Sequence, residues 1–294
     1  MFIDFLSLSV PILKISNELS GSIATKSQKI KTLPQNDIDN FLKSDDNFQK
    51  IFSCSTKLLE KSQFVVIKNI GFNQEKNLFE AFVKLFGEFY GAIEYTDIKI
   101  DCPYTGCKYD AIELHNDDAI DLQNQPKNGF IQVLNEDPLK ITQNGLVKID
   151  DVINYLEIYD ETLLFELFNH NVPMLAFGVN YDGDNKDEII THQSILYKVN
   201  QENRVRFDLT RINFYYWKKQ IKQSTKERKM IDAFLSVAKK FRTELYLAAG
   251  DILIHHNKRT LHDRTGCSFE LNSDGSLNTR DIFVSLRSTP YPSC

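Results

Sequence analysis

The chain has 294 residues, of which 42% are hydrophobic, and 35 basic against 40 acidic residues give a formal net charge of -5. This composition allows a sizeable core, and the acidic balance argues against a nucleic-acid binder or a protein that binds anionic membranes. No apolar run reaches the ~20 residues that span a bilayer, and the start lacks the positive region of a secretory signal, so we expect a cytoplasmic protein.

The N-terminal third predicts a loop, then a helix, a strand and a second helix. A stretch rich in Ser, Lys and Gln over 16–35 is typical of a loop, so we expect 1–35 to be a partly mobile segment. Apolar residues recur at helical spacings between Asn36 and Lys61. The β-branched and aromatic run Phe64–Ile70 predicts a buried strand, and the amphipathic run Leu78–Phe86 predicts a helix.

The rest of the chain predicts short strands with helices beside them. Helical periodicity is found over 150–168 and 223–241. Strands are predicted at Phe130–Leu134, Met174–Asn180, Ile189–Tyr197, Val205–Leu209, Glu244–Leu247, Ile252–His256 and Ile282–Leu286. This order predicts a mainly β fold with flanking helices, and a jelly-roll barrel fits it. Since no repeat or linker divides the sequence, we expect a single domain over 1–294.

Two histidines and one aspartate are candidates for a metal site. His115-Asn116-Asp117 would place the first and third side chains on one side of a strand. His262 follows an apolar strand far along the chain. Two imidazoles and one carboxylate can occupy one face of an octahedral metal and leave its other positions open, which is typical of non-haem Fe(II) oxygenases. His255 and His256 alternate in the same strand, so we expect supporting roles for them.

The residues around this candidate triad resemble a known family. The segments that carry the resemblance are His115-Asn116-Asp117, Gly250-Asp251, Asn257, Leu261-His262-Asp263-Arg264 and Arg280. They are similar to segments of the Fe(II)- and 2-oxoglutarate-dependent oxygenases of the taurine dioxygenase and clavaminate synthase type, over about residues 60–288. The resemblance implies a double-stranded β-helix in which His115, Asp117 and His262 hold Fe(II), with 2-oxoglutarate and O2 as cosubstrates.

The resemblance also implies a clamp for 2-oxoglutarate. Arg280, which leads into the last predicted strand, is the candidate for the far carboxylate, because a guanidinium can donate two parallel hydrogen bonds to it. Arg287 stays open as an alternative, and Val284 replaces a second arginine that many family members have. Thr142 is the candidate that completes the clamp, although the neighbouring register would favour Val147.

The sequence contains fewer indications of the substrate than of the metal site. Arg206 is the candidate for a substrate carboxylate, and since Arg211 has the opposite parity on the predicted strand, only one of them can point inward. Asp118 and Asp121 could bind an amine or simply be solvated. The aromatic run 214–217 could line a pocket or pack in the core.

The function implied by the resemblance is a dioxygenase that hydroxylates, or else desaturates, a small molecule. An amino acid or amino-acid-derived metabolite of secondary metabolism is the expected substrate, and Asp117 argues against halogenation. Two alternatives stay open: a non-catalytic jelly-roll protein that binds a metal or ligand, and a cupin-like metal-dependent isomerase or hydrolase. Arg280 separates them, because 2-oxoglutarate needs a cation for its far carboxylate whereas isomerisation does not.

Overall fold

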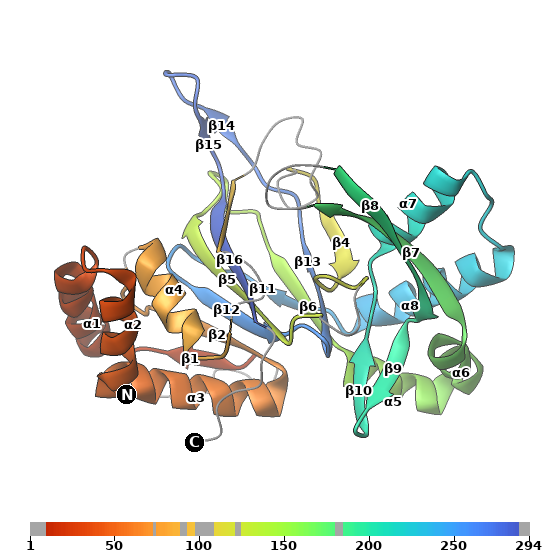
Figure 1. Ribbon diagram of the computed structural model, residues 1–294, viewed down its shortest axis with the longest axis horizontal. Helices are drawn as coiled ribbons and strands as arrows, with labels where there is room; N and C mark the ends of the chain where they lie inside the picture. Colours follow the sequence, from red (N-terminus) through yellow and green to blue (C-terminus); the bar gives the residue numbers. More distant parts are fainter. Residues whose placement is uncertain are drawn as a thin grey trace.

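The computed structural model describes residues 10–72, 75–88, 93–97, 109–120, 125–179 and 185–287, and Figure 1 shows how their elements are arranged. Helices hold a larger share of these residues than strands do. The expectation of a mainly β fold is therefore wrong, and the fold is a mixture of helices and strands. None of the helices in the described ranges is long and apolar enough to cross a membrane.

The N-terminal part of the chain is a layer of helices at one end of the molecule (Figure 1). Its elements are α1 (Asn17–Ile30), α2 (Gln35–Ser44), α3 (Asp46–Ser62) and α4 (Lys76–Lys84). Helix α1 replaces the predicted loop over 16–35: Ser16 caps it, and Ile23 and Ile30 are buried on one face. The predicted helix Asn36–Lys61 is divided in two, because the Asp45 side chain caps α3.

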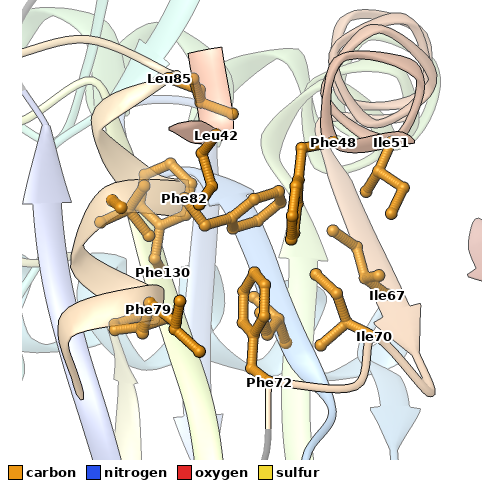
Figure 2. Packing of buried hydrophobic residues seen from close by; sticks show 14 of the residues in the cluster. Leu42, Phe48, Ile51, Ile67, Ile70, Phe72, Phe79, Phe82, Leu85 and Phe130 are labelled. Carbon is orange, nitrogen blue, oxygen red and sulfur yellow. The ribbon is translucent and has the colours of Figure 1, made fainter. Parts of the chain in front are cut away.

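A sheet lies against these helices. In the part of the chain that is described it has six strands in the order β1 (Ile12–Lys14), β2 (Phe64–Lys68), β12 (Ile252–His256), β5 (Asn128–Asn135), β16 (Asp281–Arg287) and β3 (Glu94–Asp97). Only the β1–β2 pair is parallel. Aromatic rings from the helices pack on one face of this six-stranded sheet. Figure 2 shows Phe79 and Phe82 of α4 in the same cluster as Phe130 of the sheet.

A second sheet faces the first one. Its described strands are β11 (Thr243–Leu245), β6 (Asn144–Lys148), β13 (Thr260–Arg264) and β4 (Ile112–His115), all antiparallel. Its outer side packs against the helices α5 (Ile149–Tyr159), α6 (Glu161–Asn169), α7 (Leu209–Lys219) and α8 (Thr225–Lys240). Its inner side shares a small core with the first sheet, where Leu146 meets Phe64 and Leu253.

Three two-stranded pairs complete the described strands. These are β7 (Asn171–Val179) with β8 (Asn185–Ser194), β9 (Leu196–Val199) with β10 (Glu202–Val205), and β14 (Glu270–Leu271) with β15 (Leu277–Asn278). The last residue of the predicted strand Met174–Asn180 lies outside the described residues. The predicted strand Val205–Leu209 is wrong, because Asp208 caps helix α7 there. In the described ranges the strands form separate sheets and no closed barrel.

Candidate metal centre and its pocket

Two neighbouring strands of the second sheet, β4 and β13, and the turn after β4 bring His115, Asp117 and His262 together. His115 ends β4 and lies directly opposite His262 of β13 in the antiparallel register, while Asp117 follows in the turn after β4. One Asp117 carboxylate oxygen lies 3.9 Å from His115 Nε2 and 3.7 Å from His262 Nε2. The three ligand atoms all lie within 4.8 Å of one another. The predicted triad therefore converges, although Asp117 reaches it from a turn rather than from the strand.

The hydrogen bond of His115 and the lowered pKa of His262 suit a metal ion. His115 Nδ1 lies 2.8 Å from the Glu113 carbonyl oxygen, which can only accept, so the proton is on Nδ1 and the Nε2 lone pair faces Asp117. Burial, followed by the charge of His115, lowers the pKa of His262 well below its usual value and keeps this ring neutral. Neutral imidazoles are the form that binds metals. Two nitrogens and one carboxylate oxygen fit Fe(II).

Two buried asparagines hold the turn that carries Asp117. Asn257 Oδ1 accepts from the Asp117 backbone N–H at 2.9 Å, and its Nδ2 donates to the Asp117 carbonyl oxygen at 2.9 Å. Asn116 Nδ2 donates to the carbonyl oxygens of Val205 and Asn257, and its Oδ1 accepts from Phe207 N–H at 2.7 Å. The Asn257 side chain thus holds both the N–H and the carbonyl oxygen of this candidate ligand, and the Asn116 side chain fixes the residue before it.

The triad lies in a pocket of about 160 Å³ between the two sheets. Besides the triad, residues of both sheets and the segments next to them line it: Glu94, Thr96, Ile112, Phe130, Ile131, Asn144, His255, Asp263, Arg264, Arg280, Ile282 and Val284. The lining combines carboxylates, imidazoles, guanidinium groups and an aliphatic wall. Such a mixture suits a small polar ligand with an apolar part.

Arg280, the candidate for the 2-oxoglutarate carboxylate, lies in this lining. It is 5% exposed, and its Nη2 donates to Asn144 Oδ1 at 2.9 Å. Burial lowers the pKa of Arg280 to about 10, so the guanidinium keeps its charge at neutral pH. Arg264 lines the pocket as well, but its guanidinium donates to the carbonyl oxygens of Thr265 and Asp110.

The alternatives for the clamp lie elsewhere. Arg287 shares the outer face of β16 with Phe283, whereas Ile282 and Val284 face the pocket. Val147 is buried in the core on the outer side of the second sheet. Thr142 is outside the described lining, and its hydroxyl donates to the Gly266 carbonyl oxygen at 3.4 Å. Its placement therefore does not support contact with 2-oxoglutarate.

Arg206 is also outside the described lining of the pocket. Its guanidinium donates to the carbonyl oxygens of Val172 and Gln193, and to the Thr191 hydroxyl at 2.5 Å. The side chain is fully buried, so it joins β7 and β8 instead of facing a substrate. The expectation that Arg206 and Arg211 lie on one strand and point to opposite faces is wrong, because β10 ends at Val205 and Arg211 lies in α7.

The other candidates for substrate binding are Asp118, Asp121 and the aromatic run 214–217. An oxygen of Asp118 lies 3.9 Å from Arg211 Nη2, and Asp121 lies outside the described residues. Phe214 and Trp217 stack on α7 at 5.6 Å, with Trp217 65% exposed, and neither belongs to the described lining. Trp217 therefore lies on the outer surface of α7, whereas Tyr216 packs against the core on the outer side of the second sheet.

Sequence reasoning missed several residues of the pocket, among them Glu94 and Asn144. Glu94 pairs with Val284 across β3 and β16, so both face inward. Burial, then the charges of Asp117 and Asp118, raise the pKa of Glu94. No motif marks this glutamate in the sequence. Asn144 precedes a glycine, and an Asn-Gly pair usually indicates a turn. In the structure Asn144 is instead the first residue of strand β6.

Solved structures of iron oxygenases are similar to this chain. An asparagine oxygenase in complex with Fe(II), 2S,3S-3-hydroxyasparagine and succinate aligns with a TM-score of 0.67 and 14% identity, over 95% of this chain and 93% of that one. The non-haem iron oxygenase OrfP, with Fe, succinate and (3R,4R)-dihydroxy-L-Arg, aligns with a TM-score of 0.71 and 14% identity, over 95% and 94%. OrfP with Fe and alpha-ketoglutaric acid gives 0.67 at 14% identity over the same shares. No family model and no curated protein matches the sequence. The chain thus shares the fold of these oxygenases.

Proposed function

We propose that this protein is a non-haem Fe(II)- and 2-oxoglutarate-dependent dioxygenase of the taurine dioxygenase and clavaminate synthase-like family. The observation that carries the proposal is the pocket in which His115, Asp117 and His262 converge with the buried cation of Arg280. The fold shared with iron oxygenases supports it. In this proposal residues 1–294 form a single oxygenase domain, and the two facing sheets are the core of a double-stranded β-helix.

Each of these residues has a distinct task. His115 and His262 offer Nε2 atoms and Asp117 offers a carboxylate oxygen, a set that would hold Fe(II) and leave room on it for cosubstrates. When bound, Fe(II) with 2-oxoglutarate and O2 supplies the oxidation. Arg280 binds the far carboxylate of 2-oxoglutarate, and Asn144 orients its guanidinium. A cupin-like isomerase has no need of this buried cation, so the geometry favours the dioxygenase.

The substrate in this proposal is a small amino acid or amino-acid-derived metabolite. Glu94 faces the pocket, and in the described residues no hydrogen bond or ion pair holds its carboxylate, so it is available for an amine. Ile282 and Val284 offer an apolar wall beside it. The neighbours carry hydroxylated asparagine and arginine, which supports hydroxylation as the reaction here.

A spectroscopic titration tests the function. Adding 2-oxoglutarate to the Fe(II)-loaded protein without oxygen should produce the weak visible charge-transfer band of the chelate. The substitutions Asp117→Ala and His262→Ala should each abolish the band and the formation of succinate, because each removes one ligand.

His256→Ala is the matched control, since this histidine follows the pocket residue His255 and its side chain points to the opposite face of β12. It should retain the band and part of the activity. A well-folded, iron-loaded wild-type protein that shows no band would contradict the proposal. Full activity in His262→Ala would mean that another residue is the distal ligand.

A further inference from the structure

His255 is a buried histidine of the pocket that the metal triad does not use. It lies on β12 next to Ile254, which packs in the helix-side core, so the His255 side chain points to the inner face where Leu253 also lies. The side chain is fully buried, and its ring centroid lies 4.7 Å from that of His262. The ring therefore forms the part of the pocket wall beside the distal histidine of the triad.

Neighbouring groups decide which nitrogen of His255 carries the proton. His255 Nδ1 lies 3.2 Å from Thr260 Oγ1, and the same hydroxyl lies 3.2 Å from the His256 carbonyl oxygen. A carbonyl oxygen can only accept, so the single hydroxyl hydrogen of Thr260 goes to His256. The hydroxyl must then accept from His255 Nδ1–H. In the neutral ring the lone pair is consequently on Nε2.

The strand next to His255 is shaped to admit this nitrogen. Gly129 is the register partner of His255, and a Cβ built on Gly129 would lie 2.2 Å from His255 Nε2. The ring fits only because position 129 has no side chain. Nε2 is fully buried, and none of the described residues gives it a hydrogen bond. Since a buried acceptor without a partner is costly, its donor should come from what the pocket binds.

We propose that His255 is a ligand-binding residue of this pocket, whose Nε2 accepts a hydrogen bond from an O–H or N–H group of the molecule bound beside the triad. That donor is a water molecule in the resting enzyme or a polar group of the substrate. Ionised 2-oxoglutarate has no such donor, so the cosubstrate does not satisfy Nε2. The inference rests on the proposed function only in that a small molecule and a metal occupy the pocket.

Nitrogen NMR tests the protonation and the hydrogen bond directly. The probe is histidine-¹⁵N-labelled protein loaded with zinc, alone, with 2-oxoglutarate, and with 2-oxoglutarate plus L-asparagine or L-arginine. His255→Gln assigns the resonances, because they vanish in it. We expect Nδ1 to be protonated and Nε2 to show the shift of a hydrogen-bonded acceptor. If that shift is present with zinc alone, water is the donor; if it arises on adding an amino acid, the substrate is the donor.

A proton on Nε2, or the shift of a free acceptor in every state, would overturn the proposal. This readout does not depend on turnover. If the Fe(II)–2-oxoglutarate band is absent while the NMR result is as expected, the proposed function fails and the assignment of His255 stands.

A pair of variants separates hydrogen bonding from packing. His255→Leu removes the acceptor, whereas His255→Gln places an amide oxygen within reach of the same region. Affinity for L-asparagine or L-arginine is read from the shift that either causes in the anaerobic Fe(II)–2-oxoglutarate band. We expect His255→Leu to weaken this binding about tenfold and His255→Gln to stay within about threefold of wild type. The midpoint for 2-oxoglutarate should be unchanged in both variants. Equal losses in both would show a packing role only and would sink the proposal.

Discussion

The geometry of the candidate metal site depends on the amide side chains of Asn116 and Asn257, which are not themselves candidate ligands. Asp117 lies in a turn, where a carboxylate is less restrained than on a strand. Asn257 closes a two-bond ring with the Asp117 backbone, and Asn116 ties the same turn to Val205 and Phe207. These bonds fix the backbone position of Asp117, so we expect the two asparagines to influence metal binding through Asp117.

Asn257→Ala should therefore weaken metal binding more than it weakens the fold. It removes the acceptor and the donor that hold the Asp117 backbone, together with a bond to the Pro126 carbonyl oxygen. We expect the affinity for Co(II), measured by calorimetry, to fall about 10- to 100-fold. Asn257→Asp should lie between, since it keeps the acceptor and loses the donors.

The matched control for this prediction is Asn135→Ala, an exposed asparagine on β5 that donates to Asp281. Its affinity for Co(II) should equal that of the wild type. An unchanged Co(II) affinity in folded Asn257→Ala would show that the Asp117 turn holds its shape without this side chain.

Residue chemistry explains which site residues could be predicted from the sequence. His115, Asp117 and His262 stand out because few residue types bind Fe(II), and the structure brings them together. Arg206 was misassigned because its partners come from the hairpin of β7 and β8, whose position depends on packing far along the chain. Glu94 could not be found because a carboxylate in a short strand has no distinguishing spacing.

At the scale of elements, helix α7 connects the outer helices to the metal site. Asp208 caps it, with Oδ1 accepting from Arg211 N–H at 3.1 Å, and Oδ2 accepting from Arg211 Nε at 3.1 Å. The backbone of Asp208 also forms an isolated bridge with His115. The start of α7 therefore lies directly beside a residue of the triad.

Asp208→Ala should cost about 1 kcal/mol of the free energy of unfolding, because the first turn of α7 loses its capping acceptor. Asp208→Asn keeps an oxygen at this place and should lose only a few tenths of that. Urea denaturation measures both, and the midpoint should fall without a change in slope.

Ser224→Ala removes a cap of the same kind from α8, where Ser224 Oγ accepts from Glu227 N–H at 3.1 Å. A similar loss of stability is expected, while Co(II) affinity should fall only in Asp208→Ala, whose cap adjoins His115. If both variants bound Co(II) equally well, α7 would have no influence on the triad.

Element prediction succeeded where apolar residues marked the buried face and failed where polar ones did. β12 has the bounds that the β-branched run predicts, Ile252–His256. Helix α1 was missed because serines take half of its buried positions, Ser20 and Ser27 next to Ile23 and Ile30, so that its periodicity reads as polar. Helix α7 was missed because its aromatic run also suits a strand, and only the cap at Asp208 marks its start.

At the scale of the whole molecule, the pocket lies between two sheets, and a layer of helices covers the outer face of each sheet. The first sheet packs its outer face on α1–α4, and the second packs its outer face on α5–α8 (Figure 1). The candidate metal centre lies in the pocket between their inner faces. Which strands join which sheet could not be predicted from the sequence. β4 and β13 are far apart along the chain, and only their pairing within the second sheet makes them neighbours.

This packing also buries His256, which should make the protein sensitive to acid. Burial, then the positive charges of Lys127, Arg259 and Arg204, lower the pKa of His256 to about 3, against about 6.5 in an unfolded chain. Above pH 6.5 the ring is neutral in both states and pH has no effect through it. Between pH 6.5 and 3 the unfolded chain binds a proton that the folded one excludes, so the free energy of unfolding falls by ~1.4 kcal/mol per pH unit.

The comparison of wild type with His256→Gln isolates this contribution, because every other titrating group is common to both proteins. Glutamine has no proton to gain, so the variant should lose about 2 kcal/mol less than the wild type between pH 6.5 and pH 5. Urea denaturation at pH 7.5 and pH 5.0, with equal metal content, measures the difference in the free energy of unfolding between the two proteins at each pH. His256→Gln is expected to be the less stable protein at pH 7.5, where it has only lost packing, and to recover against the wild type at pH 5.0. A gap of the same size at both pH values would mean that His256 takes up its proton in the folded protein as readily as in the unfolded chain.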